Sequence, residues 1–341
     1  MTVLPEIPEH GGQVELVMRA FPEAPEPFID LSTGISPYPY PFGEVQQTDL
    51  ARLPEQGEEE RLINAAMQAY SVQSQKLVVA GPGTQLLISL LPYVLKSRQL
   101  IVLGPTYSGH ATAWRNAGSD VHTVNEIERF REEITQPGRV GILCNPNNPD
   151  GRHHDPLALL ALAEHCAHVG SHLIVDEAYA DFENHLSVAP YLPHPALSVL
   201  RSFGKTYGLP GVRLGFLLTV ETLTERMQGM LGAWAVGTAA ITIGCKALND
   251  REWLDLQKTK LFYDMQRFLS LCWKRDVPVV GHTSLFALAR SNEAPGLWSH
   301  LCKQGIVTRS FSERLTDIRF GLPRSEAGWQ RLEHAFKTWR P

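Results

Sequence analysis

Apolar residues follow two different spacings along the middle of the chain. Short apolar runs that suit buried strands occur at residues 76–80, 100–103, 140–144, 173–175, 196–202 and 212–218. Residues 58–70, 84–95 and 155–168 carry apolar positions at helical spacing, and Asp155 followed by Pro156 is typical of a helix start. Strands that alternate with helices indicate an α/β domain with a mostly parallel sheet. Its functional groups should lie at the carboxyl ends of the strands.

The two ends of the chain have a different texture. Seven prolines in the first 40 residues discourage a long helix and leave only residues 14–20 for a short one. After residue 220, long helices are expected within 222–273, then strands near 277–280, 284–289, 306–309 and 317–320, and a last helix at 326–339. The pattern therefore predicts three parts. They are an N-terminal arm at 1–40 that packs on the small domain or on a neighbouring subunit, a large α/β domain at 41–220, and a helical connection with a small α+β domain at 221–341.

Composition narrows the class of protein. The 341 residues include 31 basic and 36 acidic side chains, a net charge of −5, so we expect no nucleic-acid partner. The longest apolar run, residues 86–95, is interrupted by Ser89 and Pro92 and is too short to span a membrane. The first residues lack the pattern of a secretory signal, which favours the cytoplasm. The five cysteines are dispersed with no C-x-x-C pair, which predicts buried thiols and no metal site.

Two strand ends carry charged side chains that need a partner. Asp176 directly follows the apolar run 173–175, where a buried carboxylate either meets a cation or caps the next turn. Lys205 follows the run 196–202 within Arg-Ser-Phe-Gly-Lys-Thr-Tyr-Gly, with Arg213 a short distance beyond. A lone lysine there is an ordinary surface residue. Its neighbours Ser202 and Arg213, however, could together bind a dianion and leave the amine available as a nucleophile.

Two further strand ends are rich in turn residues. Residues 80–85 read Ala-Gly-Pro-Gly-Thr-Gln between a strand and a helix, where backbone N–H groups favour phosphate. The segment is neither a P-loop nor a dinucleotide-binding fingerprint, so a tight structural turn remains open. Residues 145–151 read Asn-Pro-Asn-Asn-Pro-Asp-Gly, which suits either a plain turn or recognition of a polar ring substituent.

These four elements, in this order and at this spacing, resemble the fold-type I enzymes that use pyridoxal 5′-phosphate, over nearly the whole chain. The resemblance implies the α/β fold of that superfamily, with a large domain on a mostly parallel sheet, a smaller α+β domain and a homodimer. It implies that Lys205 bonds to the cofactor aldehyde, that Asp176 keeps the pyridine nitrogen protonated, and that Tyr107 stacks on the ring. The other positions implied for the cofactor are Tyr179, which with Lys205 and Asp176 makes up the catalytic set, and Gly83, Thr84, Gln85, Asn148, Ser202 and Arg213.

One segment near the C-terminus resembles the part of these enzymes that binds the substrate carboxylate. It reads Asp317-Ile318-Arg319-Phe320-Gly321, and the resemblance implies that Arg319 holds the carboxylate. A planar guanidinium suits that acceptor because it donates two parallel hydrogen bonds.

The N-terminal arm distinguishes two branches of the superfamily. His10-Gly11-Gly12-Gln13 and the segment 28–37, which contains Gly34, resemble threonine-phosphate decarboxylases of cobalamin biosynthesis. We therefore expect a cytoplasmic carboxy-lyase that converts L-threonine O-3-phosphate to (R)-1-aminopropan-2-yl phosphate and CO2. His10, the Gly11-Gly12 backbone and Arg324 are the candidates for the substrate phosphate, and Gly34 and Asn148 are further substrate contacts.

Two alternatives stay open. A histidinol-phosphate-type aminotransferase would share every cofactor residue. A regulatory protein that binds the cofactor without catalysis is less compatible with both Lys205 and Arg319 being present. One departure affects the subunit interface: Leu53 stands where aminotransferases often have a tyrosine that reaches the cofactor phosphate of the neighbouring subunit.

Overall fold

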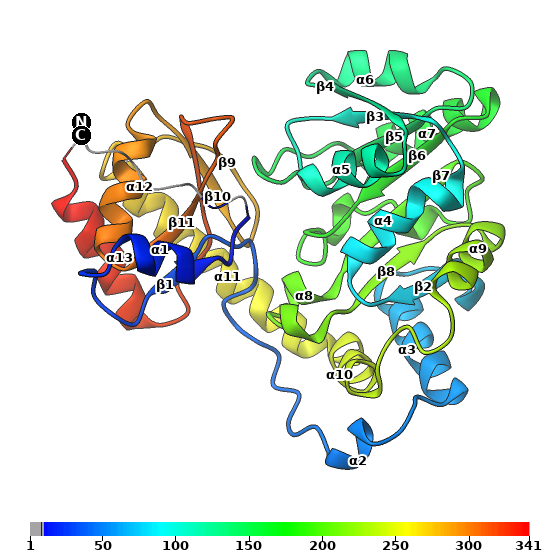
Figure 1. Cartoon of the computed structure of the whole chain (residues 1–341), viewed down its shortest axis with the longest axis horizontal. Helices are drawn as coiled ribbons and strands as arrows, with labels where there is room; N and C mark the ends of the chain where they lie inside the picture. The colour runs from blue at the N-terminus through cyan, green and yellow to red at the C-terminus, as the bar shows by residue number, and fades with distance from the viewer. Residues whose placement is uncertain (1–7, 9, 341) are drawn as a thin grey trace. The chain divides into compact units, whose positions relative to one another are not determined.

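The structure, a computed structural model, describes residue 8 and residues 10–340 and divides into two compact units (Figure 1). Unit 1 combines Met1–Tyr38, Pro149–Gly151 and Asp255–Pro341, and unit 2 combines Pro39–Asn148 and Arg152–Leu254.

The helices are α1 (Val14–Ala20), α2 (Gln47–Leu50), α3 (Gln56–Ala69), α4 (Thr84–Leu95), α5 (Ser108–Asn116), α6 (Ile127–Ile134), α7 (Pro156–Val169), α8 (Phe203–Thr206), α9 (Glu221–Leu231), α10 (Thr238–Asn249), α11 (Arg251–Trp273), α12 (Ala294–Lys303) and α13 (Glu326–Thr338). The strands are β1 (Ile29–Leu31), β2 (Val78–Gly81), β3 (Gln99–Leu103), β4 (Asp120–Val124), β5 (Val140–Cys144), β6 (His172–Asp176), β7 (Leu197–Ser202), β8 (Gly215–Leu218), β9 (Val279–His282), β10 (Ala287–Arg290), β11 (Ile306–Ser310) and β12 (Asp317–Phe320).

Unit 2 is built on a seven-stranded sheet in the order β2-β8-β7-β6-β5-β3-β4. Strands β4, β3, β5, β6 and β7 pair in parallel, whereas β8 pairs antiparallel with both of its neighbours. Strand β2 therefore points the same way as β7. The carboxyl ends of β2, β3, β5, β6 and β7 all meet at one edge of the sheet, which is where the sequence predicts the functional groups.

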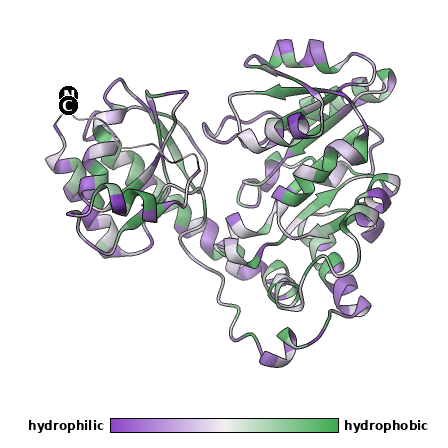
Figure 2. Cartoon of the chain, in the orientation of Figure 1, coloured by the Kyte–Doolittle hydropathy of each residue, from purple (hydrophilic) through white to green (hydrophobic). Residues whose placement is uncertain are grey.

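Helices cover both faces of this sheet. Helices α3, α6, α7 and α10 pack on one face, and α4, α5 and α9 pack on the other. Because successive strand residues point to opposite faces, β6 sends Leu173 and Val175 to the first layer and Ile174 to the second. Figure 2 shows the result as hydrophobic strands between helices with hydrophilic outer faces. The expected α/β fold with a mostly parallel sheet is confirmed.

Unit 1 contains a five-stranded sheet in the order β1-β11-β12-β10-β9. Strand β1 pairs in parallel with β11, and the remaining pairs are antiparallel. Helix α12 packs on β11, while Phe268 of α11, Phe320 of β12 and Phe336 of α13 form an aromatic cluster with ring centroids 5.2 to 6.4 Å apart. The N-terminal segment thus supplies an edge strand to the sheet of the C-terminal segment.

No helix of the described residues combines the length and the apolar character that crossing a membrane requires.

Two expected strands begin later than the sequence pattern predicts. Residues 75–77 form a short 3-10 helix before β2, because the Ser74 hydroxyl accepts a hydrogen bond from the backbone N–H of Lys76. Residues 210–212 form another, and Arg213 then takes a left-handed conformation with φ 53°, so β8 begins only at Gly215. Both deviations lie beside the strand ends that carry polar motifs.

Candidate active site

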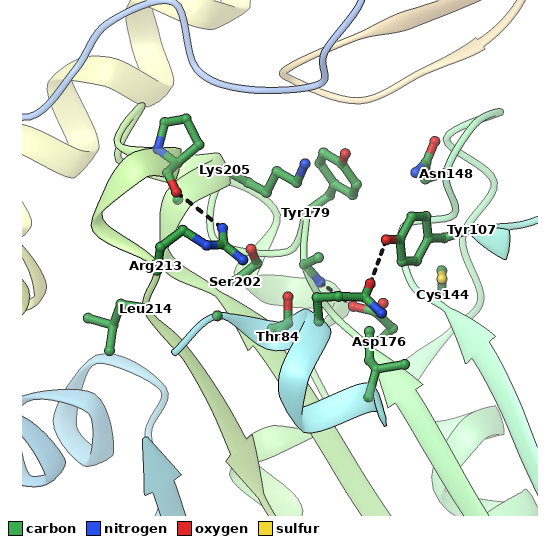
Figure 3. A pocket seen from close by; sticks show the side chains of 16 residues that line it. Thr84, Tyr107, Cys144, Asn148, Asp176, Tyr179, Ser202, Lys205, Arg213 and Leu214 are labelled. Carbon is green, nitrogen blue, oxygen red and sulfur yellow. Dashed lines mark hydrogen bonds between the residues drawn. The ribbon is translucent and has the colours of Figure 1, made fainter. Parts of the chain in front are cut away.

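A cavity of about 200 Å³ opens at the edge of the unit 2 sheet where the parallel strands end (Figure 3). All ten residues that the sequence assigns to the cofactor line it, namely Gly83, Thr84, Gln85, Tyr107, Asn148, Asp176, Tyr179, Ser202, Lys205 and Arg213. They come from five strand ends that are far apart in the sequence. Convergence of these side chains in one cavity follows from the strand order, because each motif follows a strand that points to this edge.

One end of the cavity is built for an anion. Gly83 precedes the first turn of α4 with φ 84°, and no side chain caps this helix. Gly83, Thr84 and Gln85 at this helix N-terminus line the cavity. A Cβ on Gly83 would lie 2.6 Å from Arg213 Nη2, so only glycine allows the guanidinium to approach the helix N-terminus. Ser202 adds a hydroxyl to the same cavity. Backbone donors, a helix dipole and a guanidinium together suit a phosphate dianion.

Lys205 lies on α8, a helix of only four residues that directly follows β7. The side chain is half-buried, and its Nζ lies 5.8 Å from the centroid of the Tyr179 ring. Within the described part of the chain, no acidic side chain forms an ion pair with Lys205. The amine therefore lies inside the cavity, beside the Tyr179 ring.

Asp176 ends β6 as a buried carboxylate with two partners. Oδ2 lies 2.8 Å from His110 Nε2, and Oδ1 accepts a hydrogen bond of 3.0 Å from the backbone N–H of Ala178. His110 is fully buried on α5, and Cys144 Sγ lies 3.8 Å from its Nε2. Burial, reinforced by the nearby Asp176 charge, raises the pKa of the Cys144 thiol well above its usual range, so this thiol stays neutral. His110 and Cys144 were not assigned to the site from sequence. Cys144 lies opposite Asp176 in the register of β5 with β6, and His110 reaches Asp176 from α5.

Gln85 and Tyr107 are joined to each other across the cavity wall. The Tyr107 hydroxyl donates a hydrogen bond of 2.6 Å to Gln85 Oε1, which Figure 3 shows as a dashed line. Burial is the main cause that raises the pKa of Tyr107, so the hydroxyl keeps its proton and remains a donor. This contact fixes the orientation of the aromatic ring. It also turns the Gln85 side chain toward Tyr107, so Gln85 supports the ring contact more directly than the anion end.

The donor set of the cavity fits pyridoxal 5′-phosphate. The anion end matches the phosphate group, the buried Asp176 carboxylate matches a ring nitrogen that must stay protonated, and the Lys205 amine matches an aldehyde. Tyr107, Tyr179 and Asn148 line the space between these three points. A metal ion is a second possible ligand of this region, since donor atoms of His110, Cys144 and Asp176 lie within 4.8 Å of one another. The expected absence of a metal site therefore stays a prediction.

The residues assigned to the substrate lie mainly in unit 1. Arg319 is buried on β12, donates a hydrogen bond of 2.9 Å to the Ser32 carbonyl, and lies 5.1 Å from the Phe286 ring centroid. Arg309 of β11 pairs directly opposite Arg319 in the antiparallel register. The Arg309 guanidinium donates a hydrogen bond to the Pro8 carbonyl and lies 4.9 Å from the Phe311 ring centroid. Sequence reasoning missed Arg309, because this juxtaposition exists only once the strand register is known.

The His-Gly-Gly motif of the arm packs against the segment that follows β1. The Ser32 hydroxyl accepts a hydrogen bond of 2.8 Å from the Gly12 N–H and donates one of 2.6 Å to Asp30. A Cβ on Gly11 would lie 2.4 Å from the Ser32 carbonyl oxygen, which excludes any larger residue there. The two sequence signals that favour the decarboxylase branch thus form one substructure in unit 1.

The other predicted substrate residues are spread over unit 1. His10 is exposed beside this substructure, and Gly34 is buried in the chain that follows it. Arg324 is exposed and, together with Asp30 and Ser36, lines a second cavity, which lies in unit 1. Asn148 lines the unit 2 cavity. Their roles toward a substrate remain predictions.

Comparisons with known proteins show the family to which the chain belongs. A family model for aminotransferase class I and II matches residues 17–332. The chain is 36% identical over 329 residues to the threonine-phosphate decarboxylase of Pseudomonas aeruginosa, with 96% of each protein covered. It is 27% identical over 265 residues to the histidinol-phosphate aminotransferase of Pseudoalteromonas atlantica, with 73% of this chain and 71% of that relative covered.

A solved structure supports the fold. The histidinol-phosphate aminotransferase of Sinorhizobium meliloti in complex with pyridoxal-5′-phosphate matches with a TM-score of 0.84, covering 99% of this chain and 98% of that one at 17% identity. The shared fold, the match over residues 17–332 and the 36% identity over nearly the full length point the same way. The chain belongs to the aminotransferase class I and II family and is related within it to the threonine-phosphate decarboxylases.

Proposed function

We propose that this protein is a pyridoxal-phosphate-dependent decarboxylase that converts L-threonine O-3-phosphate to (R)-1-aminopropan-2-yl phosphate and CO2. The observation that carries the proposal is the 36% identity to a threonine-phosphate decarboxylase over 96% of the chain. The packing of the His-Gly-Gly motif on Ser32 supports it, because the motif that favours this branch is part of the folded unit 1. A place in cobalamin biosynthesis and a cytoplasmic location remain predictions.

The residues of the cavity suit the chemistry that decarboxylation requires. When bound, pyridoxal phosphate supplies an aldehyde that takes up the substrate amine and a protonated ring that accepts the electron pair of a broken bond at Cα. Asp176 would hold the proton on the ring nitrogen, and His110 would fix the carboxylate for that contact. Lys205 would deliver a proton to Cα after CO2 has left, since its amine lies in the cavity. Thr84, Ser202 and Arg213 would anchor the cofactor phosphate.

Two cations of unit 1 suit the two anionic groups of the substrate. Arg319 would bind the carboxylate, and Arg309 beside it would contribute positive charge for the second anion. His10, Arg324 and the Gly11 and Gly12 backbone are further candidates for the phosphate. Binding energy from the phosphate would orient the bond that breaks, so loss of the phosphate should lower kcat as well as raise KM.

A groove beside the cavity supports a homodimer. It lies in unit 2 and shares Arg213 with the cavity. Its lining includes three large side chains that remain strongly exposed, Leu50 at 71%, Leu53 at 60% and Trp234 at 56%. A monomer gains nothing by leaving such residues in water, and we propose that a second copy covers them. Sedimentation equilibrium tests this, and a monomer at micromolar concentration would contradict it.

The experiment that tests the function compares two substrates. The purified protein loaded with cofactor is incubated with L-threonine O-3-phosphate and, separately, with L-threonine, while CO2 and the amine product are measured. The proposal predicts CO2 release from the phosphorylated substrate and a much smaller kcat/KM for threonine. Equal rates for the two would show that no phosphate site exists.

A further inference from the structure

A network of buried charges lies directly behind the wall of the cavity in unit 2. Arg201 donates hydrogen bonds of 2.6 Å to Glu177 and 2.5 Å to Asp181. The Thr206 hydroxyl donates one of 2.5 Å to the other oxygen of Asp181. Arg201, Glu177 and Thr206 expose 1% or less of their surface, and Asp181 exposes 6%. None of these four residues lines the cavity, so the network has no direct contact with whatever the cavity binds.

Three members of the network are chain neighbours of cavity residues. Glu177 follows Asp176, Arg201 precedes Ser202, and Thr206 follows Lys205. Adjacent strand residues point to opposite faces, so the chain that sends Ser202 into the cavity sends Arg201 to the other side of the sheet. Arg201 there stacks on Tyr70 at 4.5 Å, within the core layer of α3, α7 and α10. The network therefore joins the backbone segments that present the catalytic groups.

Helix α8 contacts this network through Thr206. A helix of four residues has almost no stability of its own, because forming the first turn costs more conformational entropy than its single hydrogen bond returns. Phe203 and Thr206 are buried at i and i+3 and hold one face of α8, while Lys205 on the other side is half-buried toward the cavity. Phe203 stacks on Tyr207 with ring centroids 4.5 Å apart, a contact without the fixed direction of a hydrogen bond. The Thr206 to Asp181 hydrogen bond is directional, so it defines how far the helix is turned.

Burying the charged groups of this network costs desolvation free energy, which a purely structural element would not need. Two carboxylates and one guanidinium are withdrawn from water, and desolvation is the main cause that raises the pKa of Glu177. Apolar side chains of similar volume often replace such groups without loss of stability. A charged network instead specifies one geometry, because each partner has fixed directions for its hydrogen bonds.

We propose that Asp181 is a positioning residue for catalysis, which holds Thr206 and thereby the orientation of the Lys205 side chain. Arg201 holds the Asp181 carboxylate in turn, and Glu177 holds Arg201. The proposal goes beyond the assignment of Lys205 as the catalytic amine, and it rests on the proposed function only where activity is measured.

The test uses one isosteric change and two controls in the full-length enzyme loaded with cofactor. Thr206→Val removes the hydroxyl that bonds Asp181 and keeps the side-chain volume, whereas Thr206→Ser keeps the hydroxyl. Thr224→Val makes the same change at another buried threonine of unit 2, whose hydroxyl bonds the Lys76 carbonyl at 2.7 Å. Three measurements are compared: steady-state kinetics, which give kcat and KM, the visible circular dichroism of the bound cofactor, and amide hydrogen exchange over residues 203–207.

Thr206→Val should lower kcat at least about tenfold with little change in KM, since a small displacement of a catalytic group costs more in rate than in binding. Its circular dichroism band should weaken and exchange over residues 203–207 should accelerate. Thr206→Ser and Thr224→Val should resemble the wild type in all three. A Thr206→Val enzyme with unchanged kcat, dichroism and exchange would overturn the proposal, as would equal losses in Thr224→Val.

If Thr206→Val gives too little folded protein, Asp181→Asn replaces it, because the amide keeps the shape and weakens both charged contacts; unchanged dichroism in that variant would also overturn the proposal. If the wild-type enzyme does not decarboxylate threonine phosphate, the proposed function fails. The dichroism and exchange measurements still decide the role of Asp181, since neither involves a substrate.

Discussion

The imidazole Nε2 of His110 lies 2.8 Å from Oδ2 of Asp176, and both side chains are shielded from water. With the carboxylate ionised, Nε2 carries a proton and donates it in this hydrogen bond. His110 comes from the helix that follows β3, whereas Asp176 ends β6. The contact therefore ties together two strand ends of the sheet and fixes one oxygen of the carboxylate that we assign to the cofactor ring.

Replacing Asp176 with asparagine should leave the fold intact and lower kcat at least about 10²-fold. This is the usual effect of losing one well-placed electrostatic group. The amide keeps the shape of the carboxylate but cannot hold a proton on a pyridine nitrogen. Asp155→Asn is the matched control, because asparagine is an equally good N-cap for α7. Turnover near the wild-type rate with cofactor fully bound would refute the role of Asp176.

Gly83→Ala should weaken cofactor binding at least about tenfold, because charged hydrogen bonds to a phosphate each contribute well above thermal energy. The new methyl group would lie 2.6 Å from Arg213 Nη2 and would push the guanidinium away from the helix N-terminus. Gly118→Ala also places alanine at a positive φ, 79° against 84°, but meets no atom within 4 Å. Fluorescence titration with pyridoxal phosphate measures both affinities. Equal losses in the two variants would attribute the effect to backbone strain alone.

Gly11→Ala should lower kcat/KM for threonine phosphate while leaving the cofactor affinity unchanged. A methyl group on Gly11 would overlap the Ser32 carbonyl oxygen at 2.4 Å and displace the His-Gly-Gly motif from its seat. Gly229→Ala in α9 is the control, since its methyl group meets nothing within 4 Å. Steady-state kinetics together with a cofactor titration separate the two effects. An unaffected kcat/KM would remove the arm from the substrate site.

The stability of unit 2 should fall between pH 6.5 and 4 through His172. Burial lowers the pKa of this imidazole to about 4 from a usual 6.5, with nearby His194 adding to the effect. The unfolded chain therefore takes up a proton that the folded protein refuses, and stability present above pH 6.5 is lost as pH falls through this window. The loss is about 3 kcal/mol by the time the folded pKa is reached.

His172→Gln should flatten this pH dependence. Thermal unfolding followed from pH 7 to 4 compares the variant with the wild type and with His168→Gln, whose imidazole is exposed. The control should retain the wild-type slope. Parallel curves for His172→Gln and the wild type would mean that His172 does not resist protonation in the folded protein.

The elements predicted best from sequence are those with strong apolar patterns and clear ends. The predicted ranges 14–20, 84–95, 140–144 and 317–320 coincide with α1, α4, β5 and β12. Strand β1, strand β4 and helices α5 and α6 were not predicted. The side chains of β4 are mostly exposed at the sheet edge, and the three residues of β1 form a strand only by pairing with β11, far away in the sequence. Neither feature leaves a local apolar pattern.

In the candidate site too, residues in local motifs could be predicted from sequence, and residues brought together by distant contacts could not. Motifs at strand ends could be assigned from sequence, because the direction of a parallel strand places its carboxyl end at a known edge. His110, Arg309 and Asp181 could not be identified, because each lies beside its partner only through another element. His110 needs the packing of α5, Arg309 needs the register of β11 with β12, and Asp181 needs the position of α8.

The most direct test of the account follows the fate of the substrate carbon atoms in D2O. Cofactor-loaded enzyme receives L-threonine O-3-phosphate labelled with ¹³C at the carboxylate, and in a parallel reaction receives histidinol phosphate with a 2-oxo acid. We predict labelled CO2 and an amine with one deuterium at the carbon that carried the carboxylate, with the second reaction much slower. Consumption of the 2-oxo acid at a higher rate than CO2 release would show instead that the protein is an aminotransferase.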